Sequence, residues 1–256
     1  MAENSKIEWT HHTANLWWGC TEVHEGCNNC YAKAFSHRYD GGNPLWGKDA
    51  PRRMIKSVWK DLAKYQRKAE QAGEIHRVFV GSMMDIFEKP MPLLNPFDRF
   101  ENTGDLRQEL FTKIGMGHYP NLLFLLLTKR PSNIYKYVPA GWLDDPEQNV
   151  MYGTSVVNQQ TFEMLVPQLT KVKGKRFLSM EPQLDRVLVS SVYKNEIDWI
   201  IQGGESGHGK RPFNLEWAYE LKDQCRVLGI PYFFKQIDKI RAIPEDLYIR
   251  EFPIVT

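Results

Sequence analysis

The 256-residue chain lacks the long apolar run that a membrane-spanning helix needs. Its longest purely apolar stretch, Leu122 to Leu127, is far shorter than the ~20 residues required to cross a bilayer. The first residues, Met1 to Lys6, contain no apolar core of the kind found in signal peptides. We therefore expect a cytoplasmic protein that does not associate with membranes.

The chain also lacks an excess of either charge. Its 33 Lys and Arg residues face 31 Asp and Glu residues, which leaves a net charge of +2. This balance permits nucleic-acid binding but does not argue for it. A hydrophobic fraction of 42% and a charged fraction of 25% are typical of globular proteins and exclude disordered, collagen-like and coiled-coil chains. Because no linker, repeat or shift in composition interrupts the sequence, we expect residues 1–256 to form one domain.

Cysteine is scarce, with four residues in the whole chain, yet three of them are clustered. Cys20 and Cys27 are separated by six residues, and Cys27 and Cys30 by two. A reducing compartment disfavours disulfides, so such a cluster more often binds a metal or carries redox chemistry. Cys225 lies far away on the apolar stripe of a helix predicted after Asn214, and we expect it to be a core residue.

Short apolar runs alternate with amphipathic segments about six times after the first fifty residues, which are irregular. The runs are continuous, as in parallel strands that are covered on both faces. They are Val78–Gly81, Leu122–Leu127, Val150–Gly153, Arg176–Ser179, Trp199–Gln202 and Tyr232–Phe234. Helical stripes run from Ile55 to Ala69, Leu106 to Ile114, Phe162 to Leu169 and Trp217 to Leu228, with Asn158 as an expected cap and Gly73 and Gly229 as expected stops. The alternation predicts an α/β fold built on a parallel sheet, either a barrel or an open sheet.

Polar residues follow every one of these predicted strands. The carboxyl ends of parallel strands meet at one edge, where ligands bind in such folds. The segments are Gly81–Asp85, Thr128–Pro131, Gly153–Ser155, Ser179–Pro182, Gly203–Gly207 and Lys235–Gln236. Turn chemistry explains any one of them, but six together favour a ligand site. In Gly203–Gly207 the glycines allow close approach to a ligand, and a tight turn explains them equally well.

The cysteine loop has more than one possible occupant. A structural zinc site has four ligands, so a fourth would come from His24, or from His11, His12 or His37 nearby. An iron–sulfur cluster is also held by thiolates, and with three cysteines one iron of a four-iron cluster stays open to a cofactor or substrate. A metal-free hydrolase that uses Asp85, Glu181 and Glu205 as acid and base would leave the cysteine cluster unexplained.

Six segments, in order along nearly the whole chain, resemble one known family. They are Trp17–Cys20, Gly26–Ala32, Leu127–Pro131, Met180–Pro182, Gly203–Gly207 and Phe233–Gln236. The combination is similar to a phage-associated family of radical S-adenosylmethionine (radical SAM) proteins, in which the first cysteine spacing is wider than the usual three residues. The resemblance implies a partial (β/α) barrel of six to seven parallel strands. It also implies a cluster-binding loop at about residues 15–32 and a 4Fe–4S cluster on Cys20, Cys27 and Cys30.

The resemblance implies that the open iron binds the amino and carboxylate groups of S-adenosylmethionine. An electron from an external donor would then release a 5′-deoxyadenosyl radical, which abstracts hydrogen from the substrate. The implied substrate is a modified thymine base in phage DNA, or a modified nucleotide, in the host cell cytoplasm. The implied reaction is isomerisation of an amino acid attached to 5-hydroxymethyluracil. Radical lyase chemistry or repair of a DNA lesion is an alternative, and so is a non-catalytic, zinc-stabilised nucleic-acid-binding protein.

The resemblance also suggests roles for individual residues. Candidate cofactor contacts are Asn29 and Tyr31 beside the adenine, Ser82 and Asp85 for the cofactor amino group, Ser155 and Glu181 for the ribose or carboxylate, and Gly203 and Gly204 beside the adenine or substrate. Asn29 stands where the superfamily usually has an aromatic residue. Candidate substrate contacts are Lys129, Arg130, Glu205 and Lys235. Apart from the resemblance, five basic residues follow predicted strands and are candidates for contact with an anion such as phosphate: Lys129, Arg130, Lys210, Arg211 and Lys235. Solvated surface charge explains each of them better when it is taken singly.

Overall fold

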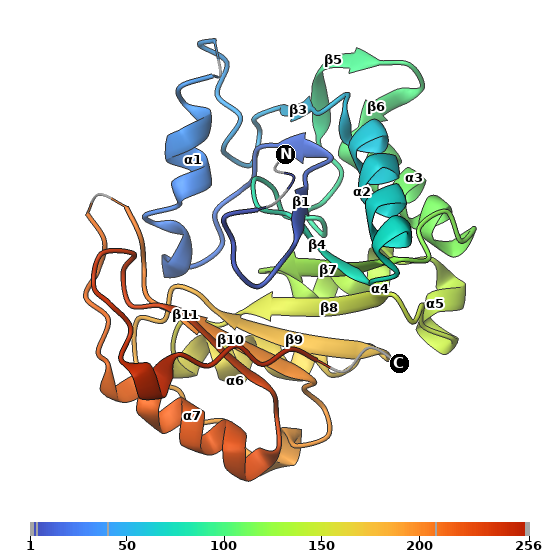
Figure 1. The fold of residues 1–256 in the computed structure, drawn as a ribbon. Coiled ribbons are helices and arrows are strands. Elements are labelled where there is room, and N and C mark those ends of the chain that lie inside the picture. The colour runs from blue at the N-terminus through green and yellow to red at the C-terminus, as the bar shows by residue number, and fades with distance from the viewer. Residues whose placement is uncertain (1–2, 4, 40, 208, 254–256) are drawn as a thin grey trace.

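The computed structural model describes residues 3, 5–39, 41–207 and 209–253, so Met1, Ala2 and Asn4 of the segment considered above lie outside it. Seven parallel strands form one curled sheet, an open half-barrel (Figure 1). In spatial order they are β1 (His12–Ala14), β4 (His76–Val80), β7 (Leu122–Thr128), β8 (Val150–Ser155), β9 (Lys175–Met180), β10 (Trp199–Gly203) and β11 (Tyr232–Gln236). All six predicted strands are confirmed, and so are the α/β class and the parallel sheet.

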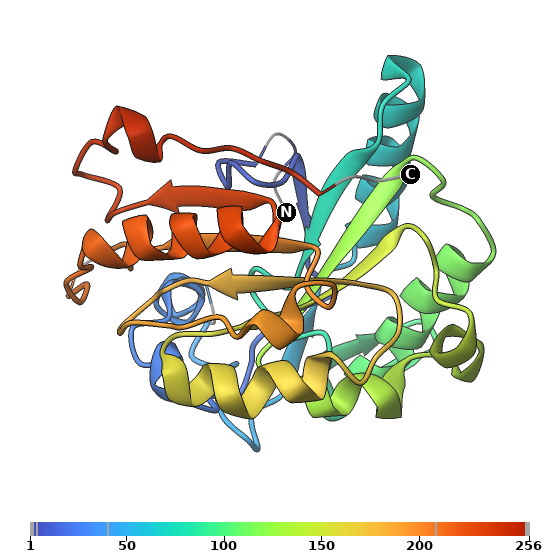
Figure 2. The same ribbon diagram turned by 90° about the horizontal axis from the view of Figure 1, so that it is seen from below.

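Four long helices cover the outside of the sheet. They are α2 (Val58–Ala72), α3 (Thr103–Gly115), α6 (Gln159–Leu169) and α7 (Glu216–Leu228). Figure 2 shows α6 and α7, in yellow and orange, running along the half of the sheet that contains β8 to β11. Asn158 caps α6 by accepting a hydrogen bond from the backbone of Thr161, and Gly73 and Gly229 end α2 and α7 in the left-handed region. The predicted cap and both predicted stops are therefore confirmed.

The strands read as continuous apolar runs because both faces of the sheet are buried. Alternate side chains such as Val78 and Leu126 pack outward against the helices. The residues between them, such as Phe79 and Leu125, point into the half-barrel and pack with Trp199. No helix within the described ranges is both long and apolar enough to cross a membrane.

A second, smaller sheet lies next to the cysteine loop and was not predicted. Its four strands, in order, are β2 (Trp17–Trp18), β3 (Arg52–Met54), β5 (Pro92–Phe97) and β6 (Phe100–Asn102). These strands are short, and β5 contains two prolines and is mostly exposed, so no apolar periodicity marks them. The described residues also form three short helices: α1 (Tyr31–Ser36), α4 (Ile134–Tyr137) and α5 (Ala140–Asp144).

Three histidines pack together at the amino-terminal ends of β1 and β4. The rings of His11 and His76 stack with centroids 4.7 Å apart, and His12 stacks on Tyr65 of α2 at 4.0 Å. His12 Nε2 lies 3.1 Å from His76 Nδ1. Burial, and then the neighbouring cationic groups, lower the pKa of both His11 and His12 to about 4. Burial therefore favours the neutral form of both rings down to about pH 4.

We expect the free energy of unfolding to fall as the pH drops from about 6.5 to about 4. In this pH range His11 and His12 become protonated in the unfolded chain but stay neutral in the folded chain. Because the unfolded state binds more protons, acidification favours unfolding. Urea titrations across this range measure the effect. The double variant His11→Asn/His12→Asn should lose less stability on acidification. An equal loss in both proteins would contradict the prediction.

Candidate functional site

A cavity opens at the carboxyl-terminal ends of the strands. Its volume is about 160 Å³, taken as the space open to the centre of a water molecule. The cysteine loop forms one side. Segments after the strands form the other, including Gly81–Asp85 after β4, Thr128 and Lys129, Ser155, Glu181 and Lys235. The parallel sheet thus brings together residues that are more than 200 positions apart in the chain.

All three clustered cysteines line this cavity. Cys20, Cys27 and Cys30 are free thiols, and α1 begins directly after Cys30. Burial, and then the charge of Asp85, raise the pKa of Cys20 to about 12 against the opposing effect of Arg130. Cys20 is therefore a neutral thiol at pH 7 unless a bound cation compensates for the loss of its proton. Cys225 lies buried on α7, which confirms its predicted place in the core.

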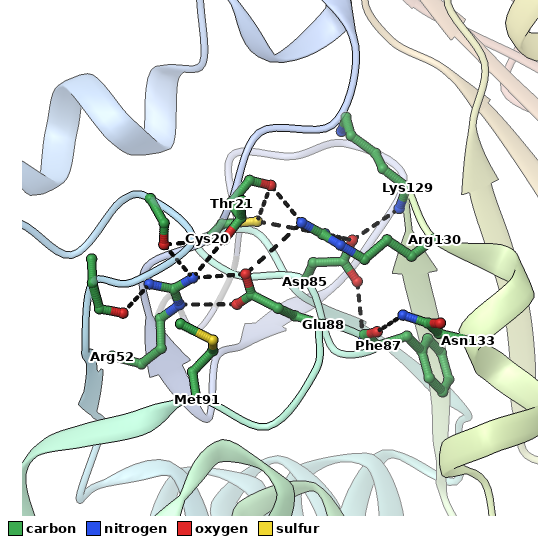
Figure 3. Close-up of polar contacts among 12 residues, drawn as sticks. Cys20, Thr21, Arg52, Asp85, Phe87, Glu88, Met91, Lys129, Arg130 and Asn133 are labelled. Carbon is green, nitrogen blue, oxygen red and sulfur yellow. Dashed lines mark hydrogen bonds and ion pairs between the residues drawn. The ribbon is translucent and has the colours of Figure 1, made fainter.

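Two arginines hold the start of the cysteine loop (Figure 3). Arg130 donates from Nη2 to the carbonyl of Thr21 at 2.5 Å, and its Nη1 lies 3.9 Å from Cys20 Sγ. Arg52 donates to the hydroxyl of Thr21 at 2.9 Å. Arg52 is fully buried and forms a bidentate ion pair with Glu88, with distances of 2.9 and 2.7 Å. Sequence analysis missed Arg52 and Glu88, because nothing in their local pattern distinguishes them from surface charges.

Asp85 holds Arg130 in place. One carboxylate oxygen accepts hydrogen bonds from the hydroxyl of Thr128 at 2.7 Å and the backbone of Phe87 at 3.0 Å. The other accepts from the backbone of Lys129 at 3.0 Å and from Arg130 Nη1 at 2.6 Å. Asp85 lines the cavity, but these four donors occupy its carboxylate. Asp85, which was a candidate contact for the cofactor, therefore serves to hold Arg130 in this structure.

A second anchor holds the other half of the cysteine loop. Glu205 is buried and accepts hydrogen bonds from the Arg211 guanidinium at 2.6 and 3.1 Å and from the Asn29 amide at 2.9 Å. Arg211 also donates to the carbonyl of Glu25 within the loop at 3.1 Å. Burial alone would raise the pKa of Glu205, but the hydrogen bonds from Arg211 and Asn29 hold it below its usual value. Glu205 and Asn29, predicted to contact substrate and cofactor, thus bind each other.

On the wall opposite the cysteine loop, Glu181 receives two donors. Trp9 Nε1 donates to one oxygen of Glu181 at 3.1 Å, and Lys235 Nζ lies 2.8 Å from the other. Lys129 Nζ donates to the hydroxyl of Ser155 at 3.3 Å. All five side chains line the cavity.

Tyr31 and Ser82 connect the cysteine loop to the segment after β4. The Tyr31 hydroxyl donates to the carbonyl of Ser82 at 2.8 Å, and the Ser82 hydroxyl accepts a hydrogen bond from the Asn15 amide at 2.8 Å. Tyr31 and Ser82 both line the cavity. Asn29, Arg130, Gly203, Gly204 and Glu205 are not among the described residues that line it.

Gly203 and Gly204 serve close packing. A Cβ atom on Gly204 would lie 2.0 Å from the carbonyl oxygen of Ile237, and one on Gly203 would lie 3.1 Å from Glu181 Oε1. The Gly204 backbone donates to the carbonyl of Gln236 at 3.0 Å and accepts from the Gln236 amide at 2.9 Å. The glycine pair thus lets the chain after β10 lie against the end of β11 and support Glu181 from behind.

The basic residues considered for contact with phosphate all have partners within the chain. Arg130 pairs with Asp85, Lys210 with Asp238, Arg211 with Glu205 and Lys235 with Glu181, and Lys129 bonds to Ser155. Phosphate would have to compete with these partners.

No group of three or more His, Cys, Asp or Glu side chains in the described ranges is close enough to hold a metal ion. His11 and His12 lie at the amino-terminal ends of the strands, away from the cavity, and His24 Nδ1 accepts a hydrogen bond from the backbone of Gly26 at 3.1 Å. Of the four histidines considered as a fourth zinc ligand, His11 and His12 are thus remote, His37 is exposed at the end of α1, and His24 keeps its Nε2 buried without a hydrogen-bond partner.

A family model described as "Protein of unknown function (DUF5131)" matches residues 4–244 of the chain. Neither a curated protein nor a solved structure matches it.

We expect the Glu205–Arg211 anchor to control access to Cys27 and Cys30. In the metal-free chain, Arg211→Gln should speed their alkylation about tenfold, because hydrogen bonds to a charged group contribute about 1.5–3 kcal/mol. Labelling measured peptide by peptide with mass spectrometry would show this, with a smaller change at Cys20. The matched control is Arg186→Gln, which removes an arginine from an exposed ion pair with Glu220. Equal labelling rates in both variants would refute the anchor.

Proposed function

The chain belongs to the DUF5131 family, whose function is unknown, so we propose its activity from its own residues: it is a radical SAM enzyme that holds a 4Fe–4S cluster on Cys20, Cys27 and Cys30. One observation carries this proposal. Three free thiols from one loop line a single cavity at the carboxyl-terminal edge of a parallel half-barrel. Ligands gather at that edge in α/β folds of this kind.

The donor set fits a cluster better than a single ion. Zinc in a structural site takes four ligands at about 2.0–2.3 Å from one centre, which gathers the ligands tightly. The described residues contain no such gathering of His, Cys, Asp or Glu side chains. A cluster takes one thiolate on each of three different irons, so its ligands need only line a common space. Three cysteines also leave one iron open for a cofactor.

When bound, the cluster and S-adenosylmethionine would supply an electron and a carbon radical for hydrogen abstraction. The chain's own residues have three tasks around them. The two anchors of the cysteine loop keep the thiols on the cavity wall. Tyr31, Ser82, Ser155 and Glu181 present hydroxyl, carbonyl and carboxylate groups that would hold the nucleoside and amino-acid parts of the cofactor. Trp9, Phe79 and Leu127 form apolar wall that excludes water from the reacting carbon.

The proposed substrate is a modified thymine base, and the proposed reaction is isomerisation of an amino acid attached to it. The aromatic rings of Trp9, Tyr31, Trp46 and Phe79 on the cavity wall support a planar ligand, because aromatic side chains stack on bases. A base in duplex DNA would have to leave the helix to enter such a cavity. The basic residues beside the cavity are already paired, so we expect recognition of the base to contribute more than phosphate contacts.

Anaerobic reconstitution with iron and sulfide tests the cluster. The wild-type chain should bind about four irons with broad visible absorption. Cys20→Ala, Cys27→Ala and Cys30→Ala should each lose most of this iron, because each removes one of three protein ligands. Cys225→Ala is the matched control and should keep the bound iron, because Cys225 lies on α7 in the protein core. A colourless wild-type chain with one zinc would overturn the proposal in favour of a zinc-stabilised binding protein.

Turnover tests the activity and the substrate. The reconstituted chain, given S-adenosylmethionine and dithionite, should form 5′-deoxyadenosine, and the cysteine variants should not. Single-stranded DNA that carries an amino-acid-modified thymine should yield an isomerised base by mass spectrometry, whereas unmodified DNA should not. Product from a thymine dimer instead would replace isomerisation by lesion repair. If the cluster-loaded chain forms no 5′-deoxyadenosine, the proposed activity is wrong.

A further inference from the structure

Arg130 lies behind the cysteine loop, where its guanidinium contacts a proposed cluster ligand. Its Nη1 is shared between Cys20 Sγ at 3.9 Å and Asp85 Oδ2 at 2.6 Å. Its Nη2 donates to the carbonyl of Thr21. The side chain is 14% exposed, and Asp85 is 6% exposed. Figure 3 shows the guanidinium between the sulfur of Cys20 and the carboxylate of Asp85.

The two basic residues after β7 have different tasks. Lys129 lines the cavity, and its side chain reaches Ser155. Arg130 points to the back of the loop, and its donors are engaged by Asp85, Thr21 and Cys20. Its predicted contact with substrate would require it to give up these partners. Arg130 therefore acts on the loop rather than on a ligand in the cavity.

Building on the proposed function, we propose that Arg130 is a positioning residue that raises the reduction potential of the cluster through its hydrogen bond to Cys20. Reduction adds one negative charge to the cluster. A cationic donor next to a coordinating sulfur stabilises that added charge, and hydrogen bonds to sulfur and local net charge are among the features that set cluster potentials. Because Arg130 and Cys20 are both only partly exposed, water screens this effect less than it would at the surface.

Asp85 and Thr128 hold the Arg130 guanidinium in its position beside Cys20. Asp85 fixes Nη1 of Arg130, and the hydroxyl of Thr128 donates to Asp85 while accepting from the backbone of Arg130 at 2.9 Å. A guanidinium held this way keeps its donor at the sulfur with little loss of side-chain entropy on binding. Lysine at this position would keep the charge but lose the planar, two-pronged contact with Asp85 and Thr21.

A redox titration of the reconstituted chain, followed by electron paramagnetic resonance, tests the inference. Arg130→Gln should keep about four irons and show a midpoint potential more negative than that of the wild type, because the positive charge next to Cys20 is lost. Arg130→Lys should lie between the two. Arg211→Gln is the matched control. It removes the same charge from the other anchor of the loop, where no contact with Cys20 exists, and should shift the potential less.

The outcomes separate this inference from the proposed function. A wild-type chain that binds no iron overturns both. A wild-type chain that holds the cluster while Arg130→Gln has the same potential overturns only the role of Arg130. Equal shifts in Arg130→Gln and Arg211→Gln would point to a general loosening of the loop and overturn it as well. Loss of the cluster in both Arg130 variants would show that Arg130 holds the cysteine loop in place. It would overturn the inference that Arg130 sets the reduction potential.

Discussion

The buried ion pair of Arg52 and Glu88 is the constraint on which the site depends. Isolated charges are costly to bury, and such a pair is tolerated only when further hydrogen bonds satisfy the remaining donors. Arg52 meets this condition with the carbonyls of Leu45 and Ala50 at 2.9 and 2.6 Å and with the hydroxyl of Thr21. Satisfying one guanidinium therefore fixes the second sheet, the segment before it and the start of the cysteine loop in one arrangement.

The cysteine loop has little regular structure, so its shape comes from anchors at both ends. Arg52 and Arg130 hold the Cys20 end, and Glu205 with Arg211 holds the stretch between Glu25 and Asn29. Both anchors use side chains that follow strands of the half-barrel or belong to the small sheet. The sheets thus hold an irregular, glycine-containing segment so that its three thiols share one cavity.

Sequence patterns predicted the parallel sheet because its strands are apolar on both faces and its helices carry ordinary caps and stops, such as Asn158 and Gly73. They left a barrel and an open sheet equally possible, and only the family resemblance implied a partial barrel. They also indicated which edge of the sheet carries the site, since a polar residue after a parallel strand lies at that edge. They did not show which way each side chain points. Glu205 and Arg130 lie at the expected edge but bind the cysteine loop. Arg52 and Glu88 are 36 positions apart in the chain, and no periodic pattern in the sequence links them. Their ion pair could therefore be recognised only from the fold.

The charged groups of the cavity wall argue against acid–base chemistry carried by the protein alone. Asp85 has four donors, Glu181 is held by Trp9 and Lys235, and Glu205 does not line the cavity among the described residues. A general acid or base must reach a substrate proton, and these carboxylates are committed to partners. A metal-free hydrolase would therefore have to release one of these carboxylates from its partners before that carboxylate could take a substrate proton. Thiols that line an aromatic cavity, on a loop held rigidly from behind, are better suited to chemistry carried by a bound cofactor, with the protein supplying orientation and exclusion of water.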